Sequence, residues 1–184
     1  MGLLEEARTA DVKVLVNGLN FKQKVDSSLE LISEAYKIYG DGLVVANSLG
    51  KDSIVVWDLV KRVSPKIRGF IVTTRFQHKE TIEFMHETVE RYPELKVYRS
   101  DADVPEKLHQ TNPDKCCGIL KVEPTRRALL EMDASCWITG LRCTEGKIRT
   151  EYKEVEERDK GLAKLNPILL WLEREIWQYL ALYS

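Results

Sequence analysis

A short polar loop between two apolar segments has the residues needed to hold an anion. It runs through Asn47, Ser48, Leu49, Gly50, Lys51, Asp52 and Ser53. Its place between a predicted strand and a predicted helix would bring backbone N–H groups and the positive end of the helix dipole together. Gly50 permits close approach, the two serines offer hydroxyls, and Lys51 offers charge. We expect a phosphate or sulfate group to bind here; a turn capped by Asp52 or Ser53 is the alternative.

Cysteine is sparse but includes one adjacent pair, Cys116-Cys117. Four cysteines in 184 residues are too few for a disulfide scaffold, so in a reducing compartment the pair indicates metal or redox chemistry. Thiolates are the ligands of iron–sulfur clusters. A cysteine that serves as a small apolar core residue is the alternative, above all for Cys136, whereas Cys143 lies near the expected site.

Polar residues also follow two other predicted strands. Thr73 and its neighbours Thr74 and Arg75 come after one, which makes them candidate walls of a ligand site. Arg142 ends the other and, with Lys51, can bind anion oxygens through its planar fork. A surface ion pair with a nearby glutamate is the alternative for Arg142. Further along, Lys147 and Arg149 either close over the ligand or form a solvated loop face.

The elements that must position these residues alternate between strand and helix. The predicted strands are Leu43 to Ala46, Ile67 to Thr73, Leu95 to Tyr98 and Cys136 to Gly140. The predicted helices are Ser28 to Tyr39 with a cap at Asp26 or Ser27, a segment from Ile54 to Val60, one from near Thr81, Ile119 to Met132, and Trp171 to Tyr183. Ser100 to Lys115 is expected to be a polar connection, and Thr144 to Lys164 a mobile charged excursion.

Strands separated by helical crossovers imply a parallel sheet with helices on both faces. The expected fold is therefore α/β, a three-layer, doubly wound, Rossmann-like parallel sheet. Ligands bind such sheets beyond the carboxyl ends of the strands, where the strand order reverses. The chain has 184 residues, 43% of them hydrophobic, which predicts a single domain over residues 1–184, with residues 1–25 as a lead-in.

Overall charge and hydropathy exclude several classes of protein. The net charge is −1, so no basic field draws the chain to nucleic acid or to an anionic membrane. No apolar run approaches the roughly 20 residues of a membrane span, and the amino terminus lacks a signal pattern, so we expect a cytoplasmic protein. The histidines His78, His86 and His109 are isolated, which gives a zinc site or a catalytic triad little support. The oligomeric state stays open, a homo-oligomer included.

The anion-binding loop is similar to that of a known superfamily. It lacks the glycine spacing of Walker A loops and of dinucleotide folds. Ser48 to Ser53 resembles the Ser-x-Gly-x-Asp-Ser loop of the ATP-pyrophosphatase superfamily, whose fold is called adenine nucleotide alpha-hydrolase-like. The resemblance implies that the loop wraps a pyrophosphate, phosphate or sulfate group. Superfamily members hold the adenosine after the second strand, so the resemblance implies a nucleotide contact near Thr73. Many members have Asp-Thr-Gly there, where this chain has Thr73-Thr74-Arg75.

Downstream segments narrow the resemblance to adenylyl-sulfate and phosphoadenylyl-sulfate reductases. Lys115 to Leu129 is similar to their Cys-Cys-x-x-x-Lys-Val-x-Pro-x-x-Arg-Ala-Leu stretch. Thr81 to Phe84 resembles a Glu-Thr-x-x-Phe region, and Thr139 to Arg142 a Thr-Gly-x-Arg strand end. Asn166 to Leu180 resembles Asn-Pro-Leu-x-x-Trp followed by Val-Trp-x-Tyr-Ile. The resemblance runs from about Ile32 to Leu180.

This resemblance implies a reaction. Family members reduce an adenylyl sulfate to sulfite and AMP: a cysteine thiolate attacks the sulfonyl sulfur, and thioredoxin or glutaredoxin then releases sulfite. Assimilatory members with the cysteine pair carry a [4Fe-4S] cluster completed by a later Cys-x-x-Cys. By resemblance, Cys116 and Cys117 are two of its ligands, and Lys121 lies between cluster and substrate.

Relatives continue where this sequence ends at Ser184, into the Cys-x-x-Cys and a Glu-Cys-Gly segment that bears the nucleophile. The nucleophilic cysteine is therefore not expected in this chain. A carboxyl-terminal part left out of the sequence, an iron–sulfur-free relative and a nucleotide-binding remnant all remain open.

Two other functions also remain open. One is a nucleotidyl transferase like the small subunit of ATP sulfurylase, whose loop also reads Ser-x-Gly-Lys-Asp-Ser; the other is a non-catalytic nucleotide-binding subunit. The cysteine pair with Lys121 favours the reductase, because adenylyl transfer needs Mg²⁺ and phosphate contacts.

Overall fold

A single six-stranded sheet forms the centre of the protein. In this computed structural model the described residues are 16, 18–145, 152–158 and 161–183. The strands are β1 (Leu43–Asn47), β2 (Arg68–Thr73), β3 (Leu95–Arg99), β4 (Cys136–Ile138), β5 (Val155–Glu157) and β6 (Ala163–Leu165). Their order across the sheet is β3-β2-β1-β4-β6-β5, and only the β5–β6 pair is antiparallel.

The helices lie between these strands in the sequence. They are α3 (Phe21–Tyr39), α4 (Lys51–Val63), α5 (Lys79–Arg91), α6 (Leu108–Thr111), α7 (Pro113–Cys117), α8 (Glu123–Glu131) and α9 (Glu173–Tyr183). Short 3-10 turns, η1 (Gly40–Gly42) and η3 (Cys143–Glu145), follow α3 and β4. A π-helical turn, η2 (Gly118–Val122), joins α7 to α8.

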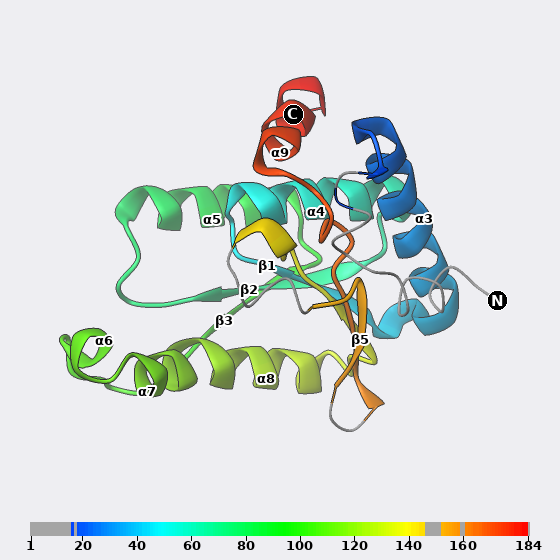
Figure 1. Cartoon of the computed structure of the whole chain (residues 1–184). Helices are drawn as coiled ribbons and strands as arrows, with labels where there is room; N and C mark the ends of the chain where they lie inside the picture. Colours follow the sequence, from blue (N-terminus) through cyan, green and yellow to red (C-terminus); the bar gives the residue numbers. More distant parts are fainter. Residues whose placement is uncertain (1–15, 17, 146–151, 159–160, 184) are drawn as a thin grey trace.

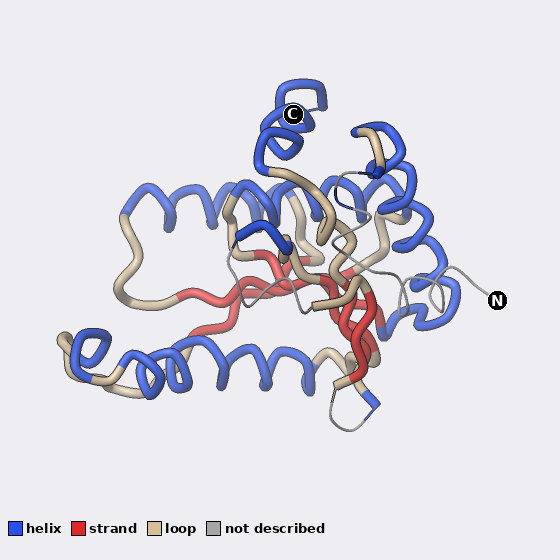
Figure 2. Tube along the Cα trace, viewed as in Figure 1, coloured by secondary structure: helices blue, strands red, loops and turns tan. Residues whose placement is uncertain are grey.

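The sheet is the middle of three layers. Figure 1 shows α3, α4, α5 and α9 on one face and α6, α7 and α8 on the other, and Figure 2 shows the strands between them. Side chains of a strand point alternately to the two faces. Val45 accordingly packs in the cluster with α3 and α4, whereas its neighbour Val44 packs with Ala128 of α8. The predicted three-layer α/β architecture is confirmed, with one antiparallel edge strand in a mostly parallel sheet.

The strand order places the ligand site. From β1 the chain moves outward to β2 and then β3, and it later returns to the other side of β1 with β4. The strand order therefore reverses between β1 and β4. In such sheets this switch point is where ligands bind, beyond the carboxyl ends of the strands. The segments after β1 and after β4 are the ones that meet there.

The start of α3 differs from the prediction, which placed it at Ser28 with a cap at Asp26 or Ser27. The helix begins at Phe21, and Asn20 caps it in a reciprocal box with Gln23. Pairs of side-chain and backbone bonds of this kind satisfy amides that a helix leaves without partners.

Parts of two expected loops are regular structure. The stretch Thr144 to Lys164, expected as an excursion, contributes β5 and the start of β6 to the sheet. The charged composition of this stretch hid β6, in which Ala163, Lys164 and Leu165 are all buried. Within Ser100 to Lys115, the structure has α6 and the start of α7.

Candidate functional site

The segment at residues 47–53, called the anion loop below, joins β1 to α4. Leu49 has a left-handed backbone conformation with φ of 63°. This conformation is unfavourable for a residue with a bulky side chain. Asn47 holds this turn, because its Oδ1 accepts the amide N–H of Leu49 at 2.8 Å. Ser53 donates its hydroxyl to Gly50 O at 2.8 Å, and its Oγ lies 3.1 Å from that of Ser48. Two hydroxyls are thus held side by side at the start of α4.

The first turn of α4 offers amide groups to an anion. The N-cap residue is Gly50, and no side chain caps this helix among the described residues. The first N–H groups of any helix have no partner inside it, and the helix dipole adds positive potential at the same place. The loop therefore combines hydroxyl and amide donors at one point.

The end of β4 packs tightly against this turn. A Cβ on Gly140 would lie 3.1 Å from the Asp52 carbonyl carbon and the Ser53 nitrogen, so a larger residue must displace backbone. Beyond it, Arg142 is only 2% exposed. Its Nε donates to Asp52 Oδ1, and its terminal nitrogens bond to Thr144 Oγ1 at 3.1 Å and Glu145 Oε1 at 3.4 Å. Arg142 therefore lies behind the anion loop.

Lys51 also binds carboxylates. Its Nζ lies 3.3 Å from Asp52 Oδ2 and 3.6 Å from Glu173 Oε1 at the start of α9. Lys51 and Arg142 both contact Asp52 in this structure. These are the two cations that the sequence predicted to bind the anion.

A cavity of about 670 Å³ opens beside the anion loop. This volume suits a small-molecule ligand, for which pockets span about 300 to 1,000 Å³. The polar end of the cavity is formed by Ser48, Gly50, Asp52 and Ser53. The sheet supplies an apolar wall of Ala46, Phe70, Val72 and Trp137. The remaining lining residues are Asn47, Thr74, Gln77, Lys121, Thr125, Thr139, Gly140, Leu141, Glu145 and Lys164. The cavity can hold a molecule with one anionic and one flat apolar part.

A second cavity, of about 470 Å³, contains the cysteine pair. Cys116 is half-buried and Cys117 exposed, and both thiols are free. Lys121 and Thr74 line this cavity and also the larger one. Lys121 therefore lies at the boundary between the cavity with the cysteine pair and the cavity beside the anion loop.

The helical turn that carries Lys121 is wider than an α-helical turn. The N–H of Glu123 bonds to Gly118 O, five residues back. Pro124 follows, and proline has no N–H with which to continue a regular helical ladder to Leu120 O. Single π turns of this kind occur often at functional sites.

The model of one protein family, the phosphoadenosine phosphosulfate reductase domain, matches residues 42–183. The chain belongs to this family. It is 33% identical over 160 residues to phosphoadenosine 5'-phosphosulfate reductase of Gloeobacter violaceus, covering 82% of this chain and 66% of that protein. It is 34% identical over 183 residues to adenosine 5'-phosphosulfate reductase of Halalkalibacterium halodurans, covering 94% of this chain and 78% of that protein.

Solved structures agree on the fold. The phosphate complex of phosphoadenylyl-sulfate reductase from Candida auris has a TM-score of 0.70 at 20% identity, covering 89% of this chain and 86% of that one. FMN adenylyltransferase of Candida glabrata has a TM-score of 0.66 at 18% identity, covering 98% of this chain and 65% of that one. The predicted adenine nucleotide alpha-hydrolase-like fold is confirmed.

Other predicted residues of this reductase-family chain lie at the margin of the cavity. Thr73 is buried and donates to Gln77 Oε1 at 2.6 Å, whereas the next residue, Thr74, lines the cavity. The Arg75 guanidinium turns away to Asp103, at 2.7 Å. Lys147 and Arg149 lie outside the described residues.

Sequence reasoning missed Lys164, which is 5% exposed and lines the larger cavity. It is beside Trp137 in the sheet register, and its Nζ lies 3.5 Å from Glu156 Oε1. The available signal was its place between two apolar residues directly before Asn166-Pro167.

Cys143 does not lie on this cavity. It is 4% exposed, and burial raises the pKa of its thiol, which keeps it protonated at neutral pH. Within the part of the chain that the structure describes, no group of three or more histidine, cysteine or acidic residues could hold a metal ion. Nor does any described helix combine the length and apolarity needed to cross a membrane.

Proposed function

We propose that this chain binds adenylyl sulfate or its 3'-phospho form and serves its reduction to sulfite and AMP, or to adenosine 3',5'-bisphosphate. The observation that carries the proposal is the position of Lys121, which lines both the cavity beside the anion loop and the one with the cysteine pair. The names of two relatives support it: one is an adenosine 5'-phosphosulfate reductase, the other a phosphoadenosine 5'-phosphosulfate reductase.

In this proposal the residues of the large cavity bind and orient the nucleotide. The Ser48 and Ser53 hydroxyls and the first amides of α4 bind an anionic oxygen, since all of them are donors at one point. The adenine packs on the apolar wall that includes Phe70 and Trp137. The Lys121 ammonium offsets charge on the sulfate and on the leaving phosphate.

The reaction itself is a two-step thiol transfer. A cysteine thiolate forms a bond to the sulfonyl sulfur, and the bond from that sulfur to the phosphate oxygen breaks, so AMP leaves with the electron pair. One thiolate of a thioredoxin- or glutaredoxin-type dithiol then attacks the cysteine sulfur, and sulfite leaves with the electron pair. The second thiol of the dithiol attacks the resulting mixed disulfide, so the cysteine thiolate is released and the dithiol ends as a disulfide. The attacking cysteine is one other than Cys116, Cys117, Cys136 and Cys143. Such thiols stay reduced in the cytoplasm, where we place the activity.

The cysteine pair fits part of an iron–sulfur site. Two adjacent free thiols at the surface of α7 can supply two thiolate ligands of a [4Fe-4S] cluster, whereas Cys136 and Cys143 are buried. When bound, the cluster supplies iron and negative charge next to the second cavity. The Lys121 ammonium lies where it would balance that charge.

Anaerobically purified protein tests the proposal. We expect AMP binding by this chain, release of sulfite from an adenylyl sulfate once thioredoxin and the attacking cysteine are both supplied, and about four irons per chain on the family analogy. Loss of iron in Cys116→Ser, with AMP binding retained, would separate the cluster site from the nucleotide site. A protein that exchanged pyrophosphate with Mg²⁺-ATP and released no sulfite would instead be a nucleotidyl transferase.

A further inference from the structure

We propose that Arg142 is a positioning residue: it holds the Asp52 carboxylate away from the bound anion and does not itself bind that anion. The inference rests on the proposed function, because it needs an anionic nucleotide at the anion loop. It assigns Arg142 a different role from the anion contact that the sequence suggested.

The first observation is that the Arg142 guanidinium is enclosed. It is 2% exposed, and each of its nitrogens has a partner: Nε bonds to Asp52, and the other two bond to Thr144 and Glu145. Asp52 and Glu145 line the large cavity, but Arg142 does not. A cation in this position acts on the ligand through the carboxylates that it holds.

The second observation is the place of Asp52. It lies in the first turn of α4, beside the amides that would bind the anion, and a carboxylate there competes for the same positive potential. Both of its oxygens are occupied, Oδ1 by Arg142 and Oδ2 by Lys51 at 3.3 Å. No side chain caps α4 in the described structure, so Asp52 leaves the first-turn amides open.

Removing Arg142 would leave a poorly paired carboxylate beside the ligand. Like charges in a partly enclosed site repel strongly, and the freed carboxylate could also turn toward the amides of α4. Lys51 alone cannot replace the contact, because its side chain is partly exposed and shared with Glu173. The anion would then lose affinity even though it never touched Arg142.

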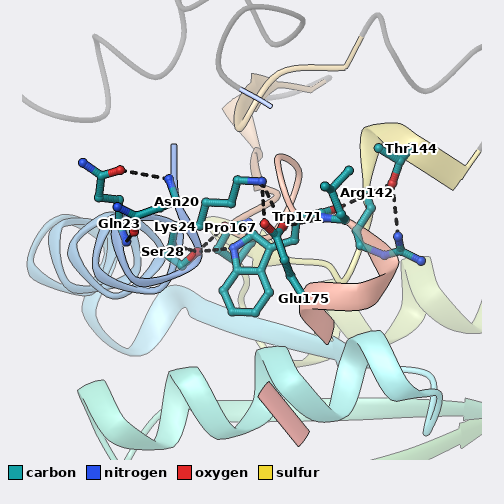
Figure 3. Close-up of polar contacts among 10 residues, drawn as sticks. Asn20, Gln23, Lys24, Ser28, Arg142, Thr144, Pro167, Trp171 and Glu175 are labelled. Carbon is teal, nitrogen blue, oxygen red and sulfur yellow. Dashed lines mark hydrogen bonds and ion pairs between the residues drawn. The ribbon is translucent and has the colours of Figure 1, made fainter. Parts of the chain in front are cut away.

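The third observation is that the base of Arg142 is fixed. The N–H of Cys143 bonds to Leu169 O at 2.9 Å, and Thr144 Oγ1 donates to Trp171 O at 3.4 Å. The Trp171 indole donates in turn to Ser28 Oγ at 3.1 Å, and Figure 3 shows this bond and the bond from Arg142 to Thr144. Arg142 thus reaches Asp52 from a backbone segment tied to α3 and to the segment before α9.

A double-mutant cycle on nucleotide affinity tests the inference. The probes are AMP, which carries a phosphate, and adenosine, which does not. Titration calorimetry measures both affinities for four proteins: wild type, Arg142→Met, Asp52→Asn and the double variant. We expect Arg142→Met to bind AMP about thirtyfold more weakly with adenosine affinity unchanged, since it leaves one member of a charge pair without its partner. The double variant should bind AMP within about threefold of wild type, because no unpaired carboxylate remains.

The double variant decides between the two roles. If it binds AMP as weakly as Arg142→Met, then Arg142 is an anion ligand and the inference is wrong. Should Arg142→Met fail to fold, the double variant alone still answers, because it lacks the arginine altogether. A wild-type chain that bound neither AMP nor adenosine would overturn the proposed function, and this inference with it.

Discussion

Lys24 of α3 and Glu175 of α9 form a buried ion pair between residues 151 positions apart. Lys24 Nζ lies 2.9 Å from Oε2 and 3.1 Å from Oε1 of Glu175, with the two residues 2% and 6% exposed (Figure 3). Glu175 Oε2 also accepts the N–H of Leu172 at 2.7 Å. The pair therefore fixes the start of α9 to α3.

The first prediction concerns this pair. Lys24→Met should lower the free energy of unfolding by about 3 to 5 kcal/mol, because it leaves a buried carboxylate without its cation. Lys24→Met combined with Glu175→Gln should recover most of the loss. Urea unfolding measures both, and Lys22→Met, exposed on the same helix, is the matched control. Equal losses in the single and double variants would contradict the explanation.

The second prediction concerns the contact between β4 and α4. Gly140→Ala places a Cβ 3.1 Å from the backbone of Asp52 and Ser53, so we expect a loss of about 1 to 3 kcal/mol of stability from overpacking. Because the shift falls on the anion loop, AMP affinity should fall more than adenosine affinity. Gly18→Ala, which meets nothing within 4 Å, should lower neither quantity. Wild-type AMP affinity in a destabilised Gly140→Ala would show that the loop does not depend on this packing.

The third prediction separates two exposed lysines of one helical run. Lys121 lines both cavities, whereas Lys115 lines neither. Lys121→Met should reduce sulfite release by about a hundredfold or more, because it removes a cation from the developing charge. Lys115→Met should leave the rate unchanged, and thermal unfolding should show both variants folded. Similar rates for the two variants would remove Lys121 from the proposed mechanism.

The fourth prediction concerns pH. Burial raises the pKa of Glu154 to about 7. In the unfolded chain this carboxyl has its ordinary, lower pKa. At pH values between the unfolded and the folded pKa, the folded state therefore binds one proton that the unfolded state does not. This stabilisation is complete below the unfolded pKa and is lost as the pH rises to about 7. Urea unfolding at pH 5 and pH 8 should show wild type losing stability relative to Glu154→Gln, by about 3 kcal/mol at most. If the difference in stability between wild type and Glu154→Gln were the same at pH 5 and pH 8, the Glu154 carboxyl would be in contact with solvent.

The central part of the fold could be predicted because its signals are local. The apolar run of β1, the glycine and hydroxyl residues of the anion loop, and the helical spacing of α4 follow one another without a break. The parallel sheet then followed from the alternation of strands and helices. The cysteine pair and Lys121 were singled out by resemblance, and their roles stay predictions; Lys121 lines both cavities.

Features that depend on distant partners could not be predicted. The contact of Arg142 with Asp52, 90 positions earlier in the chain, is one of them, because no local pattern reveals it. The strands β5 and β6 were hidden in a charged segment, because Lys164 is buried against Glu156 and the ring of Tyr152. The cap of α3 lay upstream of the strongest apolar spacing.

The π turn at Gly118–Val122 links Pro124 to the direction of side chains that precede it in the helix. A π turn takes in one residue more than an α turn, which corresponds to about 100° of rotation for everything that precedes it. The direction in which Cys116 and Cys117 point therefore depends on Pro124, which lies further along the same helical run. If Pro124→Ala allowed regular α-helical hydrogen bonds to form in place of the π turn, the two thiols would move to another face of the helix, although Cys116 and Cys117 themselves would be unchanged. The direction of the cysteine pair therefore depends on a proline further along the same stretch of sequence.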